Sequence, residues 1–218
     1  MNTRDCLTDS QNSGIRPSDL DISYWNSLRS FVHEFLHTCA ASFAPSARPH
    51  SKLLEIGPQD YGGGHPFLQY NSTLQIETID IVPSNSTYMG DITKNNSHII
   101  PDNSFDFIIC TEVLEHTLNP FDAVKELHRI LKPNGLLFFS TPCNFRIHGP
   151  SPDCWRFTHH ALQKSLFPSP IWSFVSLKAL DDPNRPLFPI DYAGVVVKNP
   201  SADLIESTSK QTTSCSLL

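Results

Sequence analysis

The stretch FDFIICTEVLEHTLNP, residues 105–120, decides the fold of this chain. It opens with a short, mostly apolar run, Phe105 to Cys110, which is typical of a strand buried inside a sheet. Two acids and an imidazole follow within five residues: Glu112, Glu115 and His116. The function of these three groups depends on what the rest of the chain builds around the end of that strand.

The next segment carries the signals of an amphipathic helix. Asn119 is a suitable N-cap, Pro120 fits the first helical position, and Asp122 favours the positive end of a helix. Pro133–Gly135 ends the pattern, and Gly135–Ser140 is a further apolar run. The helix presents one apolar stripe, formed by Phe121, Val124, Leu127 and Leu131. The sequence therefore predicts strand, helix and strand in succession.

The same alternation extends outward in both directions. Apolar residues at helical spacing, beginning with Trp25 and Leu28, predict a helix over residues 19–42. A second helix, capped by Thr158, is expected to run to Phe167. Further strands are predicted at residues 52–56, 74–81, 172–180 and 190–198. Strands alternating with helices predict an α/β fold, a mostly parallel sheet covered on both faces, with its ligand site at the carboxyl ends of the strands.

Composition restricts the class of protein. The chain has 218 residues, a net charge of −6 and no long basic run, which makes nucleic acid an improbable partner. None of its six cysteines forms a C-x-x-C pair, and their apolar surroundings favour reduced thiols in a cytoplasmic protein. No signal peptide or membrane span is expected. We predict one domain over residues 19–200 between disordered segments, 1–18 and 201–218.

A glycine-rich loop follows the first predicted strand. The sequence LLEIGPQDYGGG covers residues 53–64, and Asp80 ends the next strand, 23 residues after Gly57. A strand, a glycine loop and a later acid predict a nucleotide site in which the acid binds ribose hydroxyls. The loop lacks the G-x-G-x-x-G spacing of a dinucleotide site, which favours an adenosyl cofactor without a diphosphate, such as S-adenosylmethionine. The alternative is a flexible turn with an Asp that caps its own loop.

Taken together, these segments resemble the class I S-adenosylmethionine-dependent methyltransferases. Residues 53–57, Ile79-Asp80, Gly90–Ile92, 105–116 and 126–135 are similar to successive motifs of that family, in its order, within residues 50–200. The resemblance implies a Rossmann-like, doubly wound sheet of seven strands. It also implies that the cofactor is bound by Glu55, Gly57, Gly62, Asp80, Ile81, Asp91, Ile92, Thr111 and Glu112. The glycine loop is longer than is usual for the family.

A second resemblance is local. The segment HGPSPDCWRFT, residues 148–158, is similar to a motif of methyltransferases associated with surface-polysaccharide synthesis, with Cys154 in place of the usual aromatic residue. This resemblance implies a loop over the acceptor pocket that binds substrate through Asp153, Trp155 and Arg156. The alternative is a packed loop in which Arg156 pairs with Asp153.

The acids and the histidine then gain a candidate role. If a helix follows Cys110, then Glu112, Glu115 and His116 share one face of it, and His148 follows the adjacent strand. These four side chains predict a site for Mg²⁺ or Mn²⁺, and a similar E-x-x-E-H plus distant His pattern occurs in metal-dependent O-methyltransferases. Glu112, His116 and His148 are the candidate catalytic residues. A metal-free site with His116 or His148 as general base, and a purely structural role, are the two alternatives.

The absence of an Asn/Asp-Pro-Pro-aromatic motif after Cys110 favours O-methylation over attack by an amine. The expected reaction is transfer of a methyl group from S-adenosylmethionine to a hydroxyl of a sugar or glycan. A fused or associated glycosyltransferase would present that acceptor. The alternatives are a catechol or polyprenyl phenol, an RNA 2′-hydroxyl, and a non-catalytic adenosyl-binding module.

Overall fold

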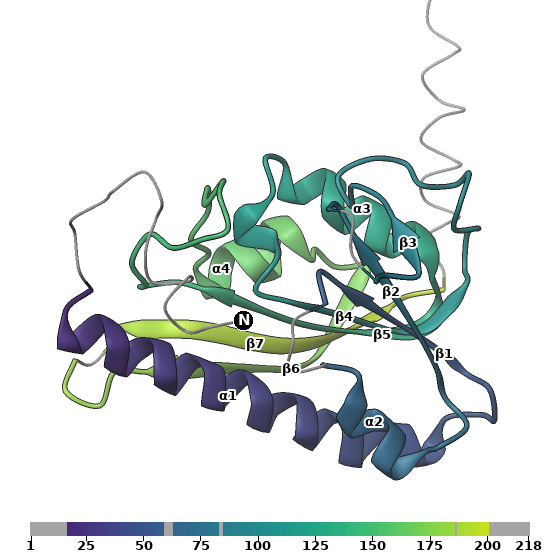
Figure 1. The fold of residues 1–218 in the computed structure, drawn as a ribbon, viewed down its shortest axis with the longest axis horizontal. Helices are drawn as coiled ribbons and strands as arrows, with labels where there is room; N and C mark the ends of the chain where they lie inside the picture. Colours follow the sequence, from purple (N-terminus) through teal and green to yellow (C-terminus); the bar gives the residue numbers. More distant parts are fainter. Residues whose placement is uncertain (1–16, 59–62, 83–84, 186, 201–218) are drawn as a thin grey trace, which may run out of the picture.

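The computed structural model describes residues 17–58, 63–82, 85–185 and 187–200. Seven strands form one sheet in the order β3-β2-β1-β4-β5-β7-β6 (Figure 1). The strands are β1 (Lys52–Ile56), β2 (Gln75–Asp80), β3 (Tyr88–Met89), β4 (Phe105–Thr111), β5 (Leu131–Pro142), β6 (Trp172–Asp181) and β7 (Pro189–Lys198). The predicted α/β class and the mostly parallel, seven-stranded sheet are confirmed.

Strand direction places the site. The first five strands of the sheet order are parallel, so β1, β2 and β4 all end at one edge of the sheet. In contrast, β7 is antiparallel to both β5 and β6. The first residues of β7 therefore lie at the carboxyl edge, where Asp191 pairs with Pro142 at the end of β5.

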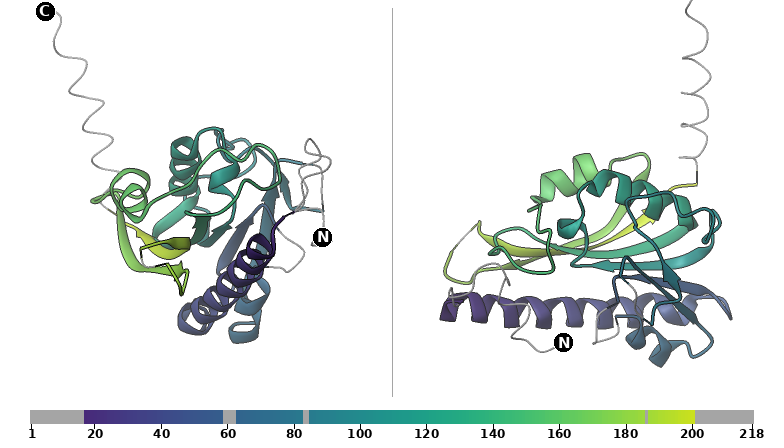
Figure 2. Two further views of the ribbon diagram at one scale, coloured as in Figure 1. Left: turned by 90° about the vertical axis from the view of Figure 1, so that its left-hand side faces the viewer. Right: turned by 45° about the horizontal axis from the view of Figure 1, so that its top comes forward.

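Two layers of helices cover the sheet (Figure 2). On one face lie α1 (Asp19–Phe43), its short continuation η1 (Ala44–Ser46) and α2 (His65–Tyr70). On the other lie α3 (Pro120–Ile130) and α4 (His159–Ala161), which a π-helical turn, η3 (Leu162–Leu166), continues. Alternate residues of β4 point to the two cores: Phe107 and Ile109 pack with α1, whereas Ile108 and Cys110 pack with α3. Burial on both faces explains why β4 reads as a continuous apolar run.

Both long helices begin where their caps predict. Ser18 caps α1, and its side chain and that of Asp21 form a reciprocal capping box. The Asn119 side chain accepts hydrogen bonds from the N–H groups of Phe121 and Asp122 at the start of α3, as predicted. Thr158 likewise caps α4. Helix α3 ends at Ile130, because Leu131 already has extended geometry and begins β5, earlier than Gly135.

The structure differs from the sequence prediction at two places. No helix begins at Glu112; the described chain forms only a 3-10 turn there, η2 (Leu114–His116). The two-residue strand β3 was not predicted, because its sequence contains no apolar run.

Within the described residues, none of the helices has the length and apolarity that crossing a membrane requires. The segments predicted to be disordered, 1–18 and 201–218, lie outside the described residues apart from Pro17 and Ser18.

Candidate active site

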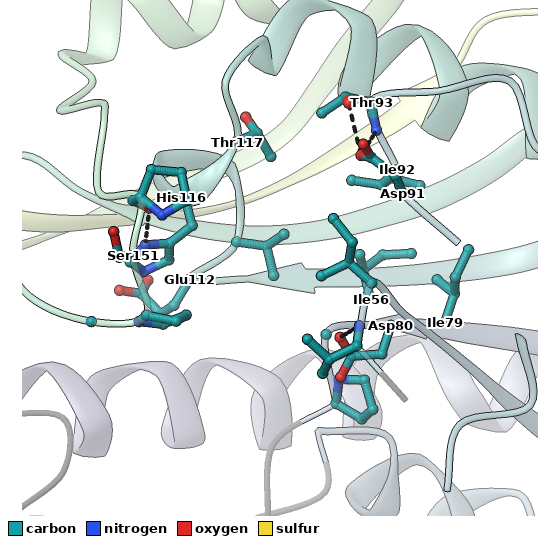
Figure 3. A pocket seen from close by; sticks show the side chains of 18 of the residues that line it. Ile56, Ile79, Asp80, Asp91, Ile92, Thr93, Glu112, His116, Thr117 and Ser151 are labelled. Atoms are coloured by element: carbon teal, nitrogen blue, oxygen red, sulfur yellow. Dashed lines mark hydrogen bonds between the residues drawn. The ribbon is translucent and has the colours of Figure 1, made fainter. Parts of the chain in front are cut away.

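A cleft of about 1040 Å³ lies over the carboxyl ends of β1, β2 and β4 (Figure 3). Its walls come from the ends of these strands, the loop after β3, the N-terminal half of α1 and the loop at residues 148–152. Six predicted cofactor residues line it: Gly57, Asp80, Ile81, Asp91, Ile92 and Glu112. The position of the cleft agrees with the rule that open α/β sheets bind ligands beyond their strand ends.

Gly57 makes the turn out of β1. Its backbone has φ of +57°, a left-handed conformation that L side chains rarely adopt, and its N–H donates to the carbonyl oxygen of Ile79 at 2.9 Å. A Cβ atom at this position would lie 3.3 Å from Cγ2 of Val113. The chain therefore passes close under the cleft, as a cofactor held by backbone approach requires.

Two acids, at the end of β2 and just after β3, line the cleft beside this turn. Asp80 ends β2, and its Oδ1 accepts a hydrogen bond from the N–H of Val82 at 3.2 Å. Oδ1 of Asp91 accepts from both the N–H and the hydroxyl of Thr93, at 2.8 and 2.7 Å, which fixes the carboxylate in a tight turn. The exposed side chain of Ile81 and the buried side chain of Ile92 supply apolar surface beside these acids. Carboxylates beside apolar surface suit the ribose and adenine of an adenosyl group.

Two of the described residues predicted to bind the cofactor, Glu55 and Thr111, do not line the cleft. Glu55 is buried, and its two carboxylate oxygens accept hydrogen bonds from the N–H groups of Gly63 and Gly64 at 2.8 and 3.1 Å. Glu55 thus holds Gly63 and Gly64, the last residues of the glycine loop, in place. Thr111 is buried at the end of β4. Gly62 lies outside the described residues.

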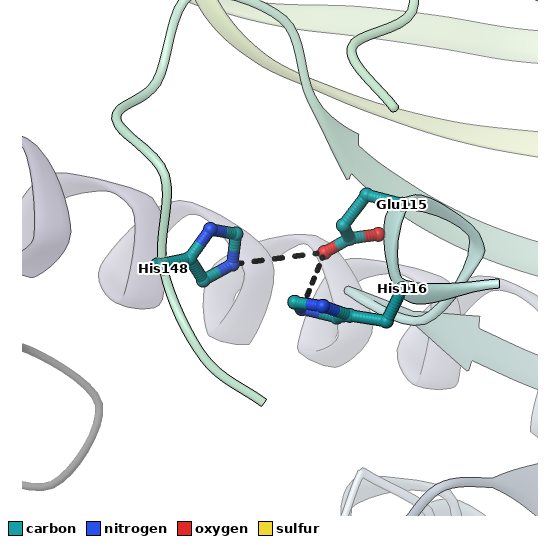
Figure 4. Close-up of side chains that lie close together, drawn as sticks. All are labelled: Glu115, His116 and His148. Atoms are coloured by element: carbon teal, nitrogen blue, oxygen red, sulfur yellow. Dashed lines mark ion pairs between the residues drawn. The ribbon is translucent and has the colours of Figure 1, made fainter. Parts of the chain in front are cut away.

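A carboxylate and two imidazoles converge at the other end of the cleft (Figure 4). Oε1 of Glu115 lies 3.6 Å from Nε2 of His116 and 3.9 Å from Nε2 of His148. One ligand atom from each of the three residues falls within 4.8 Å of the others. The turn η2 supplies the first two residues, and the loop after β5 supplies His148.

Hydrogen bonding turns the His116 ring toward this point. Nδ1 of His116 lies 2.9 Å from the carbonyl oxygen of Pro152. Because a carbonyl oxygen only accepts, Nδ1 carries the proton, and the lone pair of Nε2 points to Glu115. Burial lowers the pKa of His116 below its ordinary value and lowers that of His148 to about 4, despite the nearby Asp153 carboxylate. Both rings are therefore neutral at pH 7, the form that binds a metal.

Glu115 is the unusual member of the group. Its side chain is fully buried, and Oε1 has no hydrogen-bond partner among the residues that the structure describes. The other oxygen, Oε2, accepts one long hydrogen bond from the Thr141 hydroxyl at 3.4 Å. Burial raises the pKa of Glu115 well above its usual value, and the nearby Glu112 carboxylate adds to the rise. An ionised carboxylate buried with only one long hydrogen bond is unfavourable unless a cation compensates it, so these three side chains fit a divalent ion.

Glu112 is not brought to this trio. Its backbone has φ of +53°, and its Oε1 accepts a hydrogen bond from the Ser140 hydroxyl at 2.7 Å. The side chain instead interacts with Asp191 of β7. Among the described residues no donor reaches either Asp191 oxygen, so a proton held between the two carboxyl groups would supply the missing hydrogen bond. Burial raises the pKa of both acids, which favours such a shared proton.

The predicted substrate residues of the 148–158 segment do not line the cleft. Asp153 and Arg156 form an ion pair, and Arg156 also donates to the carbonyl oxygens of Phe145 and Arg146. The Trp155 indole donates to the carbonyl oxygen of Thr117 at 2.9 Å. The alternative reading, a packed loop with Arg156 paired to Asp153, describes these contacts.

Sequence reasoning missed two groups of residues. Asp191 sits near the start of a strand that is otherwise mostly apolar, and only the antiparallel direction of that strand brings it to the site. Trp25, Arg29 and His33 line the cleft from α1, and the Arg29 guanidinium lies over the Trp25 ring at 5.8 Å. Their i, i+4, i+8 spacing places them on one helix face, a signal that could have revealed this wall.

The sheet order, the glycine turn, the acid after β2 and the cleft above them define a class I S-adenosylmethionine-dependent methyltransferase. The chain belongs to the methyltransferase domain family, whose family model matches residues 24–181. This part of the chain is therefore an S-adenosylmethionine-dependent methyltransferase domain.

Known relatives act on different acceptor atoms. Ubiquinone biosynthesis O-methyltransferase of Histophilus somni is 51% identical over 37 residues, 17% of this chain and 16% of that protein. Thiol S-methyltransferase TMT1B of Rattus norvegicus is 29% identical over 102 residues, 40% of this chain and 41% of that one. The matches thus span less than half the length of either relative.

A solved structure shows the same fold. It is that of 1,6-didemethyltoxoflavin-N1-methyltransferase from Burkholderia thailandensis, with bound 1,6-didemethyltoxoflavin and S-adenosylhomocysteine. The TM-score is 0.54 at 14% identity, over 85% of this chain and 93% of that one. Since oxygen, sulfur and nitrogen acceptors all occur among these proteins, the acceptor of this enzyme has to be argued from its own site.

Proposed function

We propose that this enzyme transfers the methyl group of S-adenosylmethionine to a hydroxyl of a sugar or glycan, assisted by a divalent cation. The observation that carries the proposal is the fully buried Oε1 of Glu115, which finds no hydrogen-bond partner in the described part of the chain and faces Nε2 of both His116 and His148. A hydroxyl is a weak nucleophile because its pKa lies far above 7. A bound cation would lower that pKa and fix the oxygen in place.

Glu115, His116 and His148 would hold the cation. Of the two expected ions, Mg²⁺ and Mn²⁺, the pair of imidazole nitrogens favours Mn²⁺, since Mg²⁺ prefers oxygen ligands. The earlier expectation of Glu112 as a fourth ligand would require that its side chain leave Ser140 and Asp191. In its observed place Glu112 lines the cleft, where it would accept the proton of the acceptor hydroxyl.

The cofactor would bind at the opposite end of the cleft. Gly57 would let the backbone approach the methionine part, Asp80 would accept hydrogen bonds from the ribose hydroxyls, and Ile81 and Ile92 would enclose the adenine. Asp91 would accept a hydrogen bond from the adenine amine. The rate would come chiefly from holding the acceptor oxygen in line with the sulfonium methyl group and excluding water.

The wall formed by α1 supports a polyhydroxylated acceptor. Trp25 offers an aromatic face, and Arg29, Ser30 and His33 offer hydrogen-bonding groups along the same side of the cleft. The net charge of −6 gives no general attraction to RNA. A fused or associated glycosyltransferase as the source of the acceptor remains part of this proposal.

An aromatic hydroxyl is the second candidate. The 51% identity to a ubiquinone biosynthesis O-methyltransferase over 37 residues favours it, although the match covers only 16% of that protein. Both acceptor classes would use the same acid and histidine cluster, so the acceptor wall is the feature that distinguishes them.

Labelled methyl transfer tests the proposal. The enzyme would be given S-adenosylmethionine and a panel of sugars, glycans, catechols and RNA 3′ ends, after EDTA treatment and after restoration of Mn²⁺ or Mg²⁺. We expect transfer to a sugar hydroxyl that EDTA abolishes and Mn²⁺ restores. Methyl transfer that EDTA does not change would exclude the cation. It would favour His116 as the general base, since the Nε2 lone pair of that ring faces Glu115. Transfer to catechols alone would replace the sugar with a phenol.

A further inference from the structure

The loop at residues 148–157 contacts the acid and histidine cluster at several points. The N–H groups of Cys154 and Trp155 donate to the carbonyl oxygen of Glu115 at 2.8 and 3.2 Å. The carbonyl oxygen of Pro152 accepts from His116, and the Trp155 indole donates to Thr117. The loop is therefore bonded to each residue of the turn at 115–117, which carries two of the three converging side chains.

Within this loop, Asp153 contacts the third side chain directly. Its Oδ2 accepts the backbone N–H of His148 at 2.8 Å and lies 3.2 Å from Nδ1 of the same residue. The side chains of Asp153 and His148 are each only 3% exposed. Since a carboxylate only accepts, this contact favours a proton on Nδ1 of His148, and the Nε2 lone pair would then point to Glu115.

Arg156 holds Asp153 in that position. Its two terminal nitrogens donate to the two Asp153 oxygens at 2.5 and 2.7 Å, in the bidentate geometry of strong Arg–carboxylate pairs. The same nitrogen that binds Oδ2 lies 3.5 Å from Nδ1 of His148. If Asp153 did not accept from Nδ1, the guanidinium would favour a lone pair there, and the proton would move to Nε2.

We propose that Asp153 is a positioning residue, which fixes the Nδ1–H tautomer of His148 so that Nε2 is available to a cation shared with Glu115 and His116. Asp153 then acts on the cation site and does not bind the acceptor, and Arg156 holds Asp153 in place. The inference rests on the proposed cation-assisted function, but its central contact can be measured without any cation.

The test is histidine tautomer NMR on the full chain labelled with ¹⁵N-histidine, free of metal, at pH 7.5. Asp153→Asn keeps the size of the side chain and an oxygen for the His148 N–H, but it removes the carboxylate. We expect the His148 ring, assigned with His148→Gln, to be the Nδ1–H tautomer in the native protein and to gain Nε2–H in the variant. Mn²⁺ affinity, measured by EPR, should weaken about 10- to 100-fold, the usual effect of losing an outer-shell partner of a histidine ligand.

Asp102→Asn is the matched control, because Asp102 also pairs with an arginine, Arg129, but lies on the exposed surface away from the cleft. It should change neither the His148 tautomer nor the Mn²⁺ affinity. A purely structural role for Asp153 would lower the melting temperature without moving the tautomer, and that result would overturn the proposal. An Nε2–H ring in the native protein would overturn it as well. If the native protein binds no Mn²⁺ but the tautomer responds as expected, the positioning role stands and the cation is excluded from the proposed function.

Discussion

At the scale of single residues, two backbone positions in the cleft have left-handed geometry, Gly57 and Glu112. Gly57 can adopt it freely, whereas Glu112 cannot, because its Cβ makes this region unfavourable. A strained residue persists only where its surroundings fix it, and Glu112 is fixed by Ser140 and Asp191. Both residues stand at strand ends facing the cleft, where the direction of one peptide or side chain decides what a ligand meets.

The Gly57→Ala substitution should weaken cofactor binding. A left-handed alanine is destabilised by roughly 1–2 kcal/mol, and its Cβ would lie 3.3 Å from Cγ2 of Val113, so the turn must shift. We expect S-adenosylhomocysteine affinity, measured by calorimetry, to fall at least about tenfold, which corresponds to ~1.4 kcal/mol. In Gly149→Ala, the added Cβ has no atom within 4 Å, and the affinity should stay the same. An unchanged affinity in Gly57→Ala would show that the cofactor does not approach this turn.

At the scale of elements, buried ionic contacts fasten the loops and helices to the sheet. Glu126 of α3 accepts hydrogen bonds from the N–H and side-chain amide of Asn96, at 2.8 and 3.2 Å, and from two nitrogens of Arg129. This contact holds the loop that contains Asp91 against α3. Burial acts to raise the pKa of Glu126, but these hydrogen bonds outweigh it and lower the pKa below its ordinary value.

The sign of this shift predicts a pH dependence. A carboxyl group whose pKa is lower in the folded protein stabilises it above its unfolded pKa, and that contribution is lost as the pH falls through the folded pKa. Glu126→Gln should therefore lower the free energy of unfolding at pH 7 by about 1–3 kcal/mol. The difference from the native protein should shrink below about pH 4.5, as urea titrations between pH 3 and 7 would show. A constant difference across that range would contradict the assignment.

Lys198 fastens the last turn of α3 to the end of β7. Its side chain is buried, and Nζ donates to Oδ1 of Asn103, the carbonyl oxygen of His128 and the carbonyl oxygen of Leu131, at 2.9 to 3.2 Å. Lys198→Met would leave these acceptors without their donor, so the free energy of unfolding should fall by about 2–3 kcal/mol in urea titrations. Lys178→Met, at an exposed position of β6, is the control and should change it by less than about 0.5 kcal/mol. Equal effects would mean that Lys198 has no special role.

At the scale of the whole molecule, the regular secondary structure could be predicted from the sequence, but the assembled site could not. Apolar runs such as Phe105–Cys110 and caps such as Asn119 depend on local physics, so the strands and long helices could be predicted. The geometry at Glu112 could not, because a positive φ there is imposed by its tertiary contacts. Asp191 reaches Glu112 only through the direction of β7.

The function of the 148–157 loop was beyond prediction for a related reason. Its residues have no periodicity, and their partners lie about 35 residues earlier in the chain, as in the contact between Pro152 and His116. A local resemblance to polysaccharide-associated enzymes implied an acceptor role for Asp153 and Arg156, and that role stays a prediction. Their contacts in the structure are with each other, with His148 and with the backbone of Phe145 and Arg146. A sequence motif can indicate which residues are important. It does not show which neighbouring residue each of them contacts.

The proposed function of Glu115 also has a cost in the stability of the whole molecule. No donor from the described residues reaches its fully buried Oε1, so an ionised carboxylate there destabilises the protein when no cation is present, whereas a neutral amide of the same shape is easier to bury. We expect Glu115→Gln to raise the melting temperature of the EDTA-treated protein at pH 8 by a few degrees. The same substitution should abolish the stabilisation by Mn²⁺, which for the native protein reaches about 2.7 kcal/mol at a hundredfold excess over Kd. Calorimetric scans of both proteins, with and without Mn²⁺, give the four measurements. If the variant melts below the native protein in EDTA, the carboxylate is compensated by the protein itself, and the site needs no cation.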